Sequence, residues 1–459
     1  VGMKADLSKL VKGLSVNVDF SFDFNNVYVK KYGKTSDMFL FNSDGSYTHK
    51  AFASALGFGD ELSVYNSQYV FEPSINYNKY LGEVNIGYNG SENFAPGHRF
   101  GFFPAFSLGW VVSEESFFNT SVVDYLKLRA SYGLVGNDQI GGDRFLYLSL
   151  WQSADDGQFG YPNPTGGGGG VNEKRTGNES LTWEKAKKFN FGVDTRLFRS
   201  QLELTADVFY ERRSNILTNV DIVPGTYGGP AIQANAGIVE NKGLEFDATW
   251  RGRIGKDIEY FVGGNYSFAR NKIIEKPESP QAYDYLYATG RRVGQPFGYV
   301  ALGLFQSEEE ILESPSQFGV PLYPGDIKYM DVNGDGVIDT NDRYPIGFTD
   351  VPEMFYSFKF GFNYKRFDFS CLFQGAANVT YNFQTSTNIP FNNERSTPIV
   401  QWLDRWTPEN RDASLPRISY SRPGNNNYQT NTFWQNNGNY LRLKNLEVGY
   451  RLPENWVSV

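Results

Sequence analysis

Long stretches in which apolar and polar residues strictly alternate constrain this chain more than any other feature. Residues 14–24 read "LSVNVDFSFDF", with Leu, Val and Phe alternating with Ser, Asn and Asp. Such alternation predicts a β-strand with one apolar and one polar face. Strands usually run about five or six residues, whereas a tilted membrane-spanning strand needs roughly nine to eleven. The length of the pattern therefore favours strands whose apolar face meets lipid.

The same pattern recurs in pairs that predict β-hairpins with tight turns. The hairpins are expected at residues 188–210, 243–268 and 356–373. Their turns are expected at residues 199–200, 252–257 and 365–366. In "YLRLKNLEVGY" the apolar phase shifts after Leu443 and resumes at Leu446, which predicts a β-bulge near Lys444 and Asn445.

Long polar stretches rich in Gly, Asn, Pro and Ser separate the predicted hairpins. They cover residues 137–180, 211–241, 271–350 and 375–438. Short turns that alternate with long loops are typical of outer-membrane barrels, whose periplasmic turns are tight and whose outer loops are long. We therefore predict an all-β fold, a large transmembrane antiparallel β-barrel. The alternative is a secreted all-β binding or adhesion module, in which the apolar faces would meet in a dry core.

Composition argues against several other classes of protein. The mean hydropathy is -0.45 and no eighteen apolar residues run together, so no transmembrane helix is expected. A net charge of -8 argues against binding to nucleic acid. The single Cys371 excludes an internal disulfide, and His49 and His98 make no zinc cluster.

We also predict that the protein is not an enzyme. A third interpretation, a β-rich glycan hydrolase, lacks an acid and base pair: adjacent Glu114 and Glu115 would point to opposite faces of a strand. The glycine run at 165–170 lacks the Lys and Ser/Thr of a phosphate-binding loop, so a flexible loop is expected there.

Six segments in order resemble the SusC/RagA-type transporters, which are TonB-dependent outer-membrane proteins of the Bacteroidota. The segments are "FGFFPAFSLGWVVSEESFF" (100–118), "YLKLRASYGLVGN" (125–137), "NESLTWEKAKKFNFGVD" (178–194), "NKGLEFDATW" (241–250), "DVNGDGVIDTNDR" (331–343) and "NYLRLKNLEVGYRLP" (439–453). Each is weakly specific by itself, and their common order carries the resemblance.

The resemblance implies a barrel of twenty-two strands in the bacterial outer membrane, with an N-terminal plug inside it. It implies uptake of glycan or peptide oligomers, a SusD-like lipoprotein as a lid over the outer mouth, and import driven by TonB. Nothing in residues 1–459 matches the plug, the TonB box or the leader domain of that family, no signal peptide opens this sequence, and we expect the final strands of the barrel not to be included in it. We therefore expect residues 1–459 to form a barrel portion that is incomplete at both ends, roughly two thirds of the wall. The missing strands are expected to come from elsewhere or to have been left out.

The sharpest local motif, "DVNGDGVIDTND", has the spacing of a calcium loop within the predicted extracellular loop at 271–350. Gly336 occupies the sixth position, where the sharp turn requires glycine. The ligands at positions 1, 3, 5, 7, 9 and 12 would be Asp331, Asn333, Asp335, the backbone carbonyl of Val337, Asp339 and Asp342. We predict a structural calcium ion at residues 331–342. The alternative is a metal-free loop closed by Asx turns.

Aromatic residues in the long loops are candidate platforms for stacking on sugar rings or gripping a peptide. They are Tyr227, Tyr283, Tyr285, Phe383, Trp402, Trp406 and Trp434. The alternatives for each are packing between the loops and contact with a lid protein. A polar lining of the barrel wall is expected from Asp19, Asp194, Arg196, Glu203 and Asp207.

Overall fold

The computed structural model describes most of the chain and divides it into two compact units. The described residues are 2–11, 13–29, 32–33, 38–41, 46–51, 57–58, 62–77, 79–139, 144–154, 170–220, 228–385, 388–391, 397–420 and 425–453. The first unit comprises Val1–Leu108, Tyr132–Ala186 and Thr226–Asn235, and the second comprises Gly109–Ser131, Lys187–Gly225 and Ala236–Val459. Each unit is considered by itself below.

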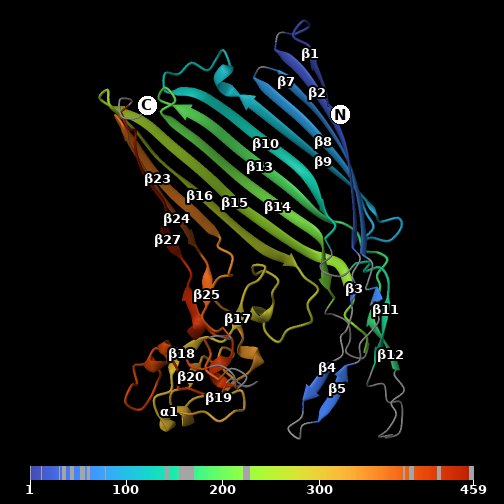
Figure 1. The fold of residues 1–459 in the computed structure, drawn as a ribbon, viewed down its shortest axis with the longest axis vertical. Coiled ribbons are helices and arrows are strands. Elements are labelled where there is room, and N and C mark those ends of the chain that lie inside the picture. Colours follow the sequence, from blue (N-terminus) through green and yellow to red (C-terminus); the bar gives the residue numbers. More distant parts are fainter. Residues whose placement is uncertain are drawn as a thin grey trace. The chain divides into compact units, whose positions relative to one another are not determined.

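Long antiparallel strands dominate the described part of the chain (Figure 1). They are β1 (Gly2–Asp6), β2 (Leu14–Val29), β7 (Leu62–Tyr77), β8 (Tyr80–Ser91), β9 (Phe100–Val111), β10 (Val123–Asn137), β13 (Glu184–Leu197), β14 (Leu202–Asn219), β15 (Gln233–Ile254), β16 (Ile258–Glu275), β23 (Met354–Tyr364), β24 (Phe367–Ala377) and β27 (Tyr440–Tyr450). Each is hydrogen-bonded to its neighbour in this order, so the sheet is a meander of 13 strands within the described residues.

Shorter elements lie between the long strands. The short strands are β3 (Tyr32–Gly33), β4 (Met38–Phe41), β5 (Tyr47–Ala51), β6 (Gly57–Phe58), β11 (Leu150–Ala154), β12 (Gly170–Arg175), β17 (Phe297–Gly298), β18 (Ala301–Leu304), β19 (Ser316–Gln317), β20 (Ile327–Tyr329), β21 (Val337–Ile338), β22 (Tyr344–Pro345), β25 (Thr380–Asn382) and β26 (Gln435–Asn437). The helices are α1 (Glu308–Leu312), η1 (Val112–Glu114), η3 (Asp284–Leu286), η4 (Thr340–Asp342), η6 (Val400–Asp404), η7 (Asn426–Tyr428) and η8 (Thr432–Trp434). Among the described residues, no helix is long and apolar enough to cross a membrane.

The second and third predicted hairpins, both in the second unit, are confirmed by the register of their strands. In the third hairpin Phe358 lies opposite Phe373, and Tyr364 lies opposite Phe367 across the turn at 365–366. In the second hairpin the register runs from Leu244 opposite Phe268 to Ile254 opposite Ile258. The turn of the first hairpin is wider than predicted, because β13 ends at Leu197 and β14 begins at Leu202.

The predicted bulge in the last long strand is also confirmed. Along β24 and β27, Leu372 pairs with Asn445 but Phe373 pairs with Leu443, so Lys444 has no partner in the ladder. The extra residue returns the apolar side chains to one face after the phase shift in the sequence.

The apolar face of the long strands is exposed. Within the second unit, Phe246 is 43% exposed, Phe358 47% and Leu443 50%, although each belongs to a row of apolar residues along the sheet. In the first unit, Phe22 is 50% exposed and Phe102 is 56% exposed. A dry core between two sheets would bury such rows. Exposed apolar rows with the length of these strands are the arrangement expected of a lipid-facing surface.

Two predicted loops begin or end at the wrong residues. The stretch 211–241 was predicted as a loop, but β14 continues to Asn219 and β15 starts at Gln233. β16 likewise continues to Glu275, beyond the predicted loop start at 271. The alternation is lost there because both faces carry polar side chains, such as Glu211 and Arg212, while the backbone still pairs. The segment between β2 and β7, with β3 to β6, was not predicted as a loop.

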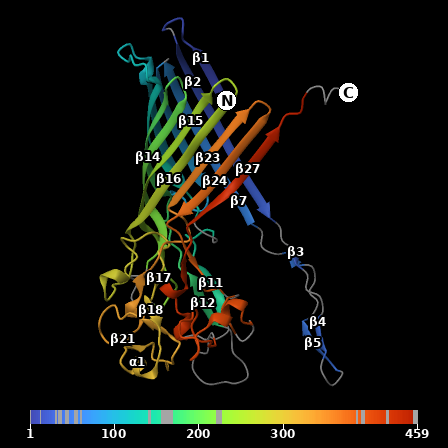
Figure 2. The same cartoon turned by 90° about the vertical axis from the view of Figure 1, so that its left-hand side faces the viewer.

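A second centre of packing lies in the loops of the second unit. We call the described residues of 297–345 and 380–437 the loop assembly. Its buried core consists of Tyr299, Ile327, Tyr329, Ile338, Trp402, Leu415 and Trp434. Short strand pairs such as β18 with β20 and β25 with β26 frame this core. Figure 2 shows β17, β18 and α1 beyond the ends of β23, β24 and β27 that lie opposite the tight turn.

Candidate functional site

The polar face of the second unit carries an ion-pair network across β10, β13 and β14. Arg129 Nε lies 2.8 Å from Asp194 Oδ2, and Arg129 Nη2 lies 2.9 Å from Asp207 Oδ2. Gly192 makes room for this cluster, because a Cβ there would come within 2.5 Å of Asp207 Oδ1 and 2.7 Å of the Arg129 guanidinium. Thr205 donates a further hydrogen bond to Asp194. The predicted polar lining residues Asp194 and Asp207 therefore belong to one cluster.

A second charged cluster, centred on Glu203, lies across β13, β14 and β15. Its carboxylate lies 2.7 Å from Arg251 Nη1 and 3.9 Å from Arg196 Nε. Side chains of Glu203, Arg196 and Arg251 are 42 to 56% exposed, so such pairs contribute at most about 1 kcal/mol each to stability. Their main effect is to keep this face of the sheet polar and hydrated.

Of the tryptophans predicted as stacking platforms, Trp402 and Trp434 lie in the core of the loop assembly, and Trp406 is also buried. Trp402 is 1% exposed, Trp434 2% and Trp406 8%. Phe383 stacks on Trp434 with ring centroids 6.3 Å apart and rings tilted by 14°. The three buried tryptophans therefore fit the alternative interpretation, packing between the loops, and Phe383 is partly buried against the same core. Tyr227 lies outside the described residues.

Tyr283 and Tyr285 stand apart from that core and stack on each other. Their ring centroids are 5.3 Å apart and their planes differ by 8°. The Tyr285 hydroxyl donates a hydrogen bond to the Asn341 carbonyl, 2.6 Å away, and burial together with the nearby Asp342 raises the pKa of Tyr285. Tyr283 is 37% exposed. One exposed ring of the pair therefore remains a candidate for ligand contact, next to the predicted calcium loop.

The predicted calcium loop is closed by carboxylates that accept backbone N–H groups. Asp331 accepts from Gly334 and Gly336, at 2.7 and 2.8 Å. The fully buried Asp342 accepts from Val332 and Asp339, each at 2.8 Å. Carboxylate, amide and carbonyl oxygens are the hard donors that calcium prefers. Within the described ranges, however, no three acidic, histidine or cysteine side chains gather around one point, so a bound ion would have to draw these donors together.

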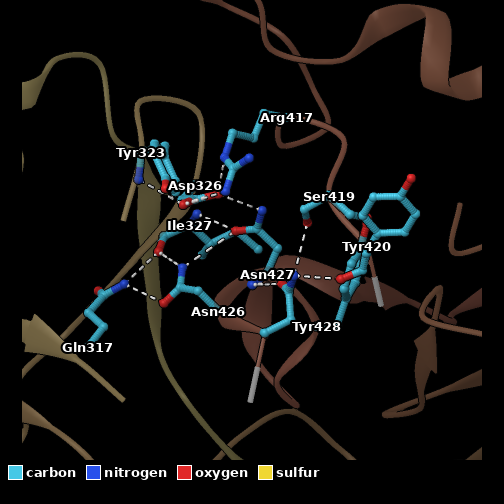
Figure 3. Close-up of polar contacts among 11 residues, drawn as sticks. Gln317, Tyr323, Asp326, Ile327, Arg417, Ser419, Tyr420, Asn426, Asn427 and Tyr428 are labelled. Atoms are coloured by element: carbon cyan, nitrogen blue, oxygen red, sulfur yellow. Dashed lines mark hydrogen bonds and ion pairs between the residues drawn. The ribbon is translucent and has the colours of Figure 1, made fainter. Parts of the chain in front are cut away.

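A buried network of amide and carboxylate side chains joins two distant stretches of the loop assembly (Figure 3). Gln317 donates from Nε2 to the Asn426 side chain at 2.7 Å, and its Oε1 accepts from the Tyr329 backbone N–H at 2.7 Å. Asn427 Oδ1 accepts from the Ile327 N–H at 2.8 Å. Side chains thus form the hydrogen bonds to backbone N–H and C=O groups that neighbouring strands would form in a longer sheet. Burial raises the pKa of Tyr329, whose hydroxyl donates to the Asn426 carbonyl.

Asp326 is the charged centre of this network. Its side chain is 1% exposed and accepts from Arg417 twice, from Nε at 2.6 Å and from Nη2 at 3.2 Å. It also accepts from Asn427 Nδ2 at 2.8 Å and from the Tyr323 N–H at 2.9 Å. Arg417 in turn covers the Tyr323 ring at 4.6 Å. A buried carboxylate with four donors is well compensated, and it ties residues 323–329 to residues 417–427.

A pocket of about 760 Å³ opens beside the Asp326 and Arg417 pair. Its described lining is Val320, Pro321, Tyr323, Asp326, Arg417, Ile418, Ser419, Tyr420, Asn425 and Asn426. Tyr323 is 52% exposed and Tyr420 is 58% exposed, so both present ring surface to solvent. Apolar and aromatic walls with a few fixed polar groups are typical of pockets for small ligands or single units of an oligomer. We call it the loop pocket.

The loop assembly is attached to the long strands through Glu353, which precedes β23. Glu353 is 7% exposed and lies 2.7 Å from Arg270 Nη2 and 2.6 Å from Arg292 Nε. Asn378 donates to the same carboxylate at 3.1 Å. The three partners come from β16, from the segment after it and from the residue that follows β24. Glu353 therefore fixes where both long loops of the second unit leave the sheet.

Sequence reasoning missed the residues that form the loop pocket and its network. Gln317, Asp326, Asn426 and Asn427 lie in polar, loop-like sequence, where burial has no periodic signal. Tyr323 and Tyr420 were overlooked among the many loop tyrosines. The one available signal was local: the run "NNNY" at 425–428 is rich in side chains that cap backbone groups.

Comparison with known proteins identifies the class of the fold. The family described as "TonB dependent receptor-like, beta-barrel" matches residues 4–459, and the chain belongs to this family. Its fold is therefore the transmembrane antiparallel β-barrel of that family, and the protein is one of the bacterial outer membrane. The family consists of receptors and transporters. The secreted adhesion module and the glycan hydrolase are both set aside by this membership.

Curated relatives support the predicted SusC/RagA resemblance. TonB-dependent receptor P3 of Formosa agariphila is 26% identical over 98% of this chain and 48% of its own length. TonB-dependent receptor P26 of the same organism is 30% identical over 82% of this chain and 38% of its own length. TonB-dependent receptor SusC of Bacteroides thetaiotaomicron is 25% identical over 90% of this chain and 40% of its own length. The chain thus spans half or less of the relatives it matches.

Solved structures share the fold at low sequence identity. The RagAB peptide transporter matches with a TM-score of 0.72 and 17% identity, over 99% of this chain and 48% of that chain. The RagAB peptide importer in its "open-open" state matches with a TM-score of 0.74 and 16% identity, over 100% of this chain and 48% of that chain. These similarities confirm the fold.

Proposed function

We propose that this chain is part of an importer that takes up glycan or peptide oligomers across the outer membrane. The observation that carries the proposal is the match of the whole described wall to a transporter family, together with a polar, ion-paired sheet face in the second unit. A hydrated face suits a polar solute, because each polar group of the solute can replace a hydrogen bond to water by one to a polar side chain of the wall. Energy for uptake would come from TonB, acting through a plug that lies outside the matched sequence.

We propose the loop pocket as a contact site for one unit of the oligomer. Tyr323 and Tyr420 offer exposed aromatic faces, which stack on sugar rings or on peptide side chains. Asn425, Ser419 and Arg417 line the same pocket and supply donors to hydroxyl or carbonyl oxygens. Because Asp326 fixes Arg417 by a buried ion pair, the polar side of the pocket is preorganised.

The test compares uptake by the protein and by a pocket variant in cells that lack the native copy. Tyr323→Ala with Tyr420→Ala should weaken binding of the imported oligomer by about tenfold or more, since each lost aromatic contact contributes about 1 kcal/mol. Tyr381→Ala is the matched control, because Tyr381 is 55% exposed in β25 and does not line the pocket. Glycan and peptide oligomers tested in parallel by calorimetry would separate the two substrate classes. Unchanged affinity for every imported oligomer in the double variant would reject the pocket as a contact site.

A SusD-like lipoprotein lid is the proposed partner of the loop assembly. Exposed apolar side chains there offer a contact surface: Leu312 is 85% exposed, Val400 78% and Leu403 76%. Single exposed apolar side chains are common, but two leucines and a valine of such high exposure in one loop assembly are more typical of a surface that contacts a protein partner. Co-purification of a lipoprotein with the native protein, lost in Leu312→Glu with Leu403→Glu, is the expected result. Leu452→Glu, at a residue 56% exposed after β27, is the control.

A structural calcium ion at residues 331–342 remains part of the proposal. The ligand types at the six expected positions and the left-handed φ of 83° at Gly336 support it. Chelation should increase hydrogen exchange at Gly334 and Gly336, and added Ca²⁺ should restore protection. Identical exchange with and without chelator would instead favour the loop closed by backbone hydrogen bonds.

A further inference from the structure

Basic side chains collect on the apolar face of the second unit, at the strand ends that lead into the long loops. They are Lys187, Arg212, Lys242 and Lys272, which we call the basic belt. The three lysines are exposed, and the Arg212 side chain is 40% exposed. The chain as a whole carries a net charge of -8, so this cluster of cationic side chains has the opposite sign to the net charge of the chain.

The strand register places the belt on one face. Lys188 pairs with Glu211 across β13 and β14 at 3.3 Å, on the polar face. The next residues outward in register, Lys187 and Arg212, therefore lie side by side on the opposite, apolar face. In the same strands the apolar face continues as Phe189 and Phe191 in β13, which are 44% and 38% exposed.

The register of β15 and β16 extends the belt. Lys272 lies opposite Glu240, and Lys242 lies two residues before Leu244, which pairs with Phe268. Arg212 forms an ion pair with Glu240, which links β14 to this row. The belt thus borders the exposed apolar rows directly, on the side of the long loops.

The charge of the belt is incompletely balanced. In the rows that carry the belt, Glu240 pairs with Arg212 and lies opposite Lys272, while Arg270, opposite Lys242, pairs with Glu353. Among the described residues, no carboxylate forms an ion pair with Lys187, Lys242 or Lys272. In an outer-membrane barrel the long loops face outward, so these lysines lie at the depth of the outer-leaflet headgroups.

We propose that the basic belt binds the phosphate groups of outer-leaflet lipid headgroups. Lysine side chains beside an apolar band reach toward the interface, where anionic headgroups attract them strongly. Several cations in adjacent strands present donors to one phosphate while the acyl chains cover the aromatic rows below. The inference depends on the membrane location of the family and not on what the protein imports.

The test uses the protein purified in detergent from outer membranes and lipid A as the probe, in diphosphorylated and dephosphorylated forms. Replacing Lys187, Lys242 and Lys272 by Gln leaves the Arg212 pair intact. Affinity for the diphosphorylated lipid should fall by about tenfold or more at low salt. Dephosphorylated lipid should bind the native protein and the variant equally. Millimolar inorganic phosphate should not compete, because it lacks the acyl chains that contact the apolar rows.

The matched control replaces Arg199, Lys256 and Lys365 by Gln. These substitutions also remove three positive charges, but in the tight turns at the opposite strand ends. All three residues are exposed. The control should keep its affinity within about twofold. Equal loss in both variants, no loss in the first, or competition by free phosphate would each overturn the proposal. So would a first variant that loses the co-purified lipoprotein but binds lipid normally, since the belt would then be a protein interface.

Discussion

Removing the carboxylate of Asp326 perturbs a buried ion pair at the centre of the loop assembly. In Asp326→Ala the guanidinium of Arg417, the amide of Asn427 and the N–H of Tyr323 all lose their acceptor. Removing one partner of a buried ion pair costs about 3–5 kcal/mol. Arg417 is 30% exposed and can regain some hydration, so we expect the lower end, about 3 kcal/mol.

Hydrogen exchange of the folded protein in detergent measures this loss locally. A cost of about 3 kcal/mol corresponds to roughly a hundredfold faster exchange for amides that exchange by opening of the loop assembly. The Ile327 and Tyr329 N–H groups are the reporters, since both donate to side chains of the network. Val262 in β16 is the internal reference, and its exchange should not change.

Two further variants separate charge from shape. Asp326→Asn keeps the volume and one acceptor oxygen, and should cost about 1.5 kcal/mol, the value of a hydrogen bond to a charged group. Asp412→Ala removes an exposed carboxylate of the same loop assembly and should leave exchange unchanged. If Ile327 and Tyr329 exchange at the native rate in Asp326→Ala, the network does not hold the two loops together, and the account of the pocket is wrong.

Three other perturbations address the same loops. Trp434→Ala should destabilise the loop assembly by about 3–5 kcal/mol, because it empties a site that is 2% exposed; limited proteolysis at increasing urea would detect it, and native resistance would contradict it. Glu353→Gln should lower the free energy of opening of the loop ends by about 3 kcal/mol, because a buried ion pair is lost. Hydrogen exchange should then become faster near Arg292 but not in β15, and the same change of rate at both positions would count against an anchoring role for Glu353. Burial raises the pKa of Tyr428 to about 12, so its contribution to loop stability should be present below pH 10 and lost as pH rises to about 12; Tyr428→Phe should weaken that alkaline transition, and an unaltered transition would assign it to other groups.

The strands were predictable because their signal is local. A strand in the wall meets lipid on one face and polar surroundings on the other. Its side chains therefore alternate between apolar and polar, and this alternation can be seen within a few neighbouring residues of the sequence. Even the bulge at Lys444 left a visible phase shift, since the apolar face must resume after it. The prediction failed near Glu211 and Arg212, where the strands continue beyond the apolar band. Backbone pairing continues there without any alternation in the side chains.

The structure of the loops was not predictable because the contacts that define it join residues far apart in the sequence. Gln317 bonds to Asn426 across 109 residues, and Asp326 bonds to Arg417 across 91. No periodicity in either stretch indicates that these side chains become buried together. The tryptophans show the same problem, since an aromatic residue in a polar segment is equally typical of a ligand platform and of a small core. Trp402 and Trp434 belong to the core, and the sequence contains nothing that separates them from Tyr323 or Tyr420.

The chemistry of the network explains how such loops keep a defined pocket. Short strands like β19 and β20 pair through few backbone hydrogen bonds, so many buried N–H and C=O groups need other partners. Asparagine and glutamine supply both a donor and an acceptor, and Asn426 uses its Nδ2 on the Ile327 carbonyl while its Oδ1 accepts from Gln317. An apolar contact would allow the two stretches to pack in several relative positions. This set of hydrogen bonds forms completely in only one of them. The pocket beside Arg417 therefore depends also on Gln317 and Asn427, which do not line it, and substitutions of these two residues should alter binding without changing a residue of the pocket wall.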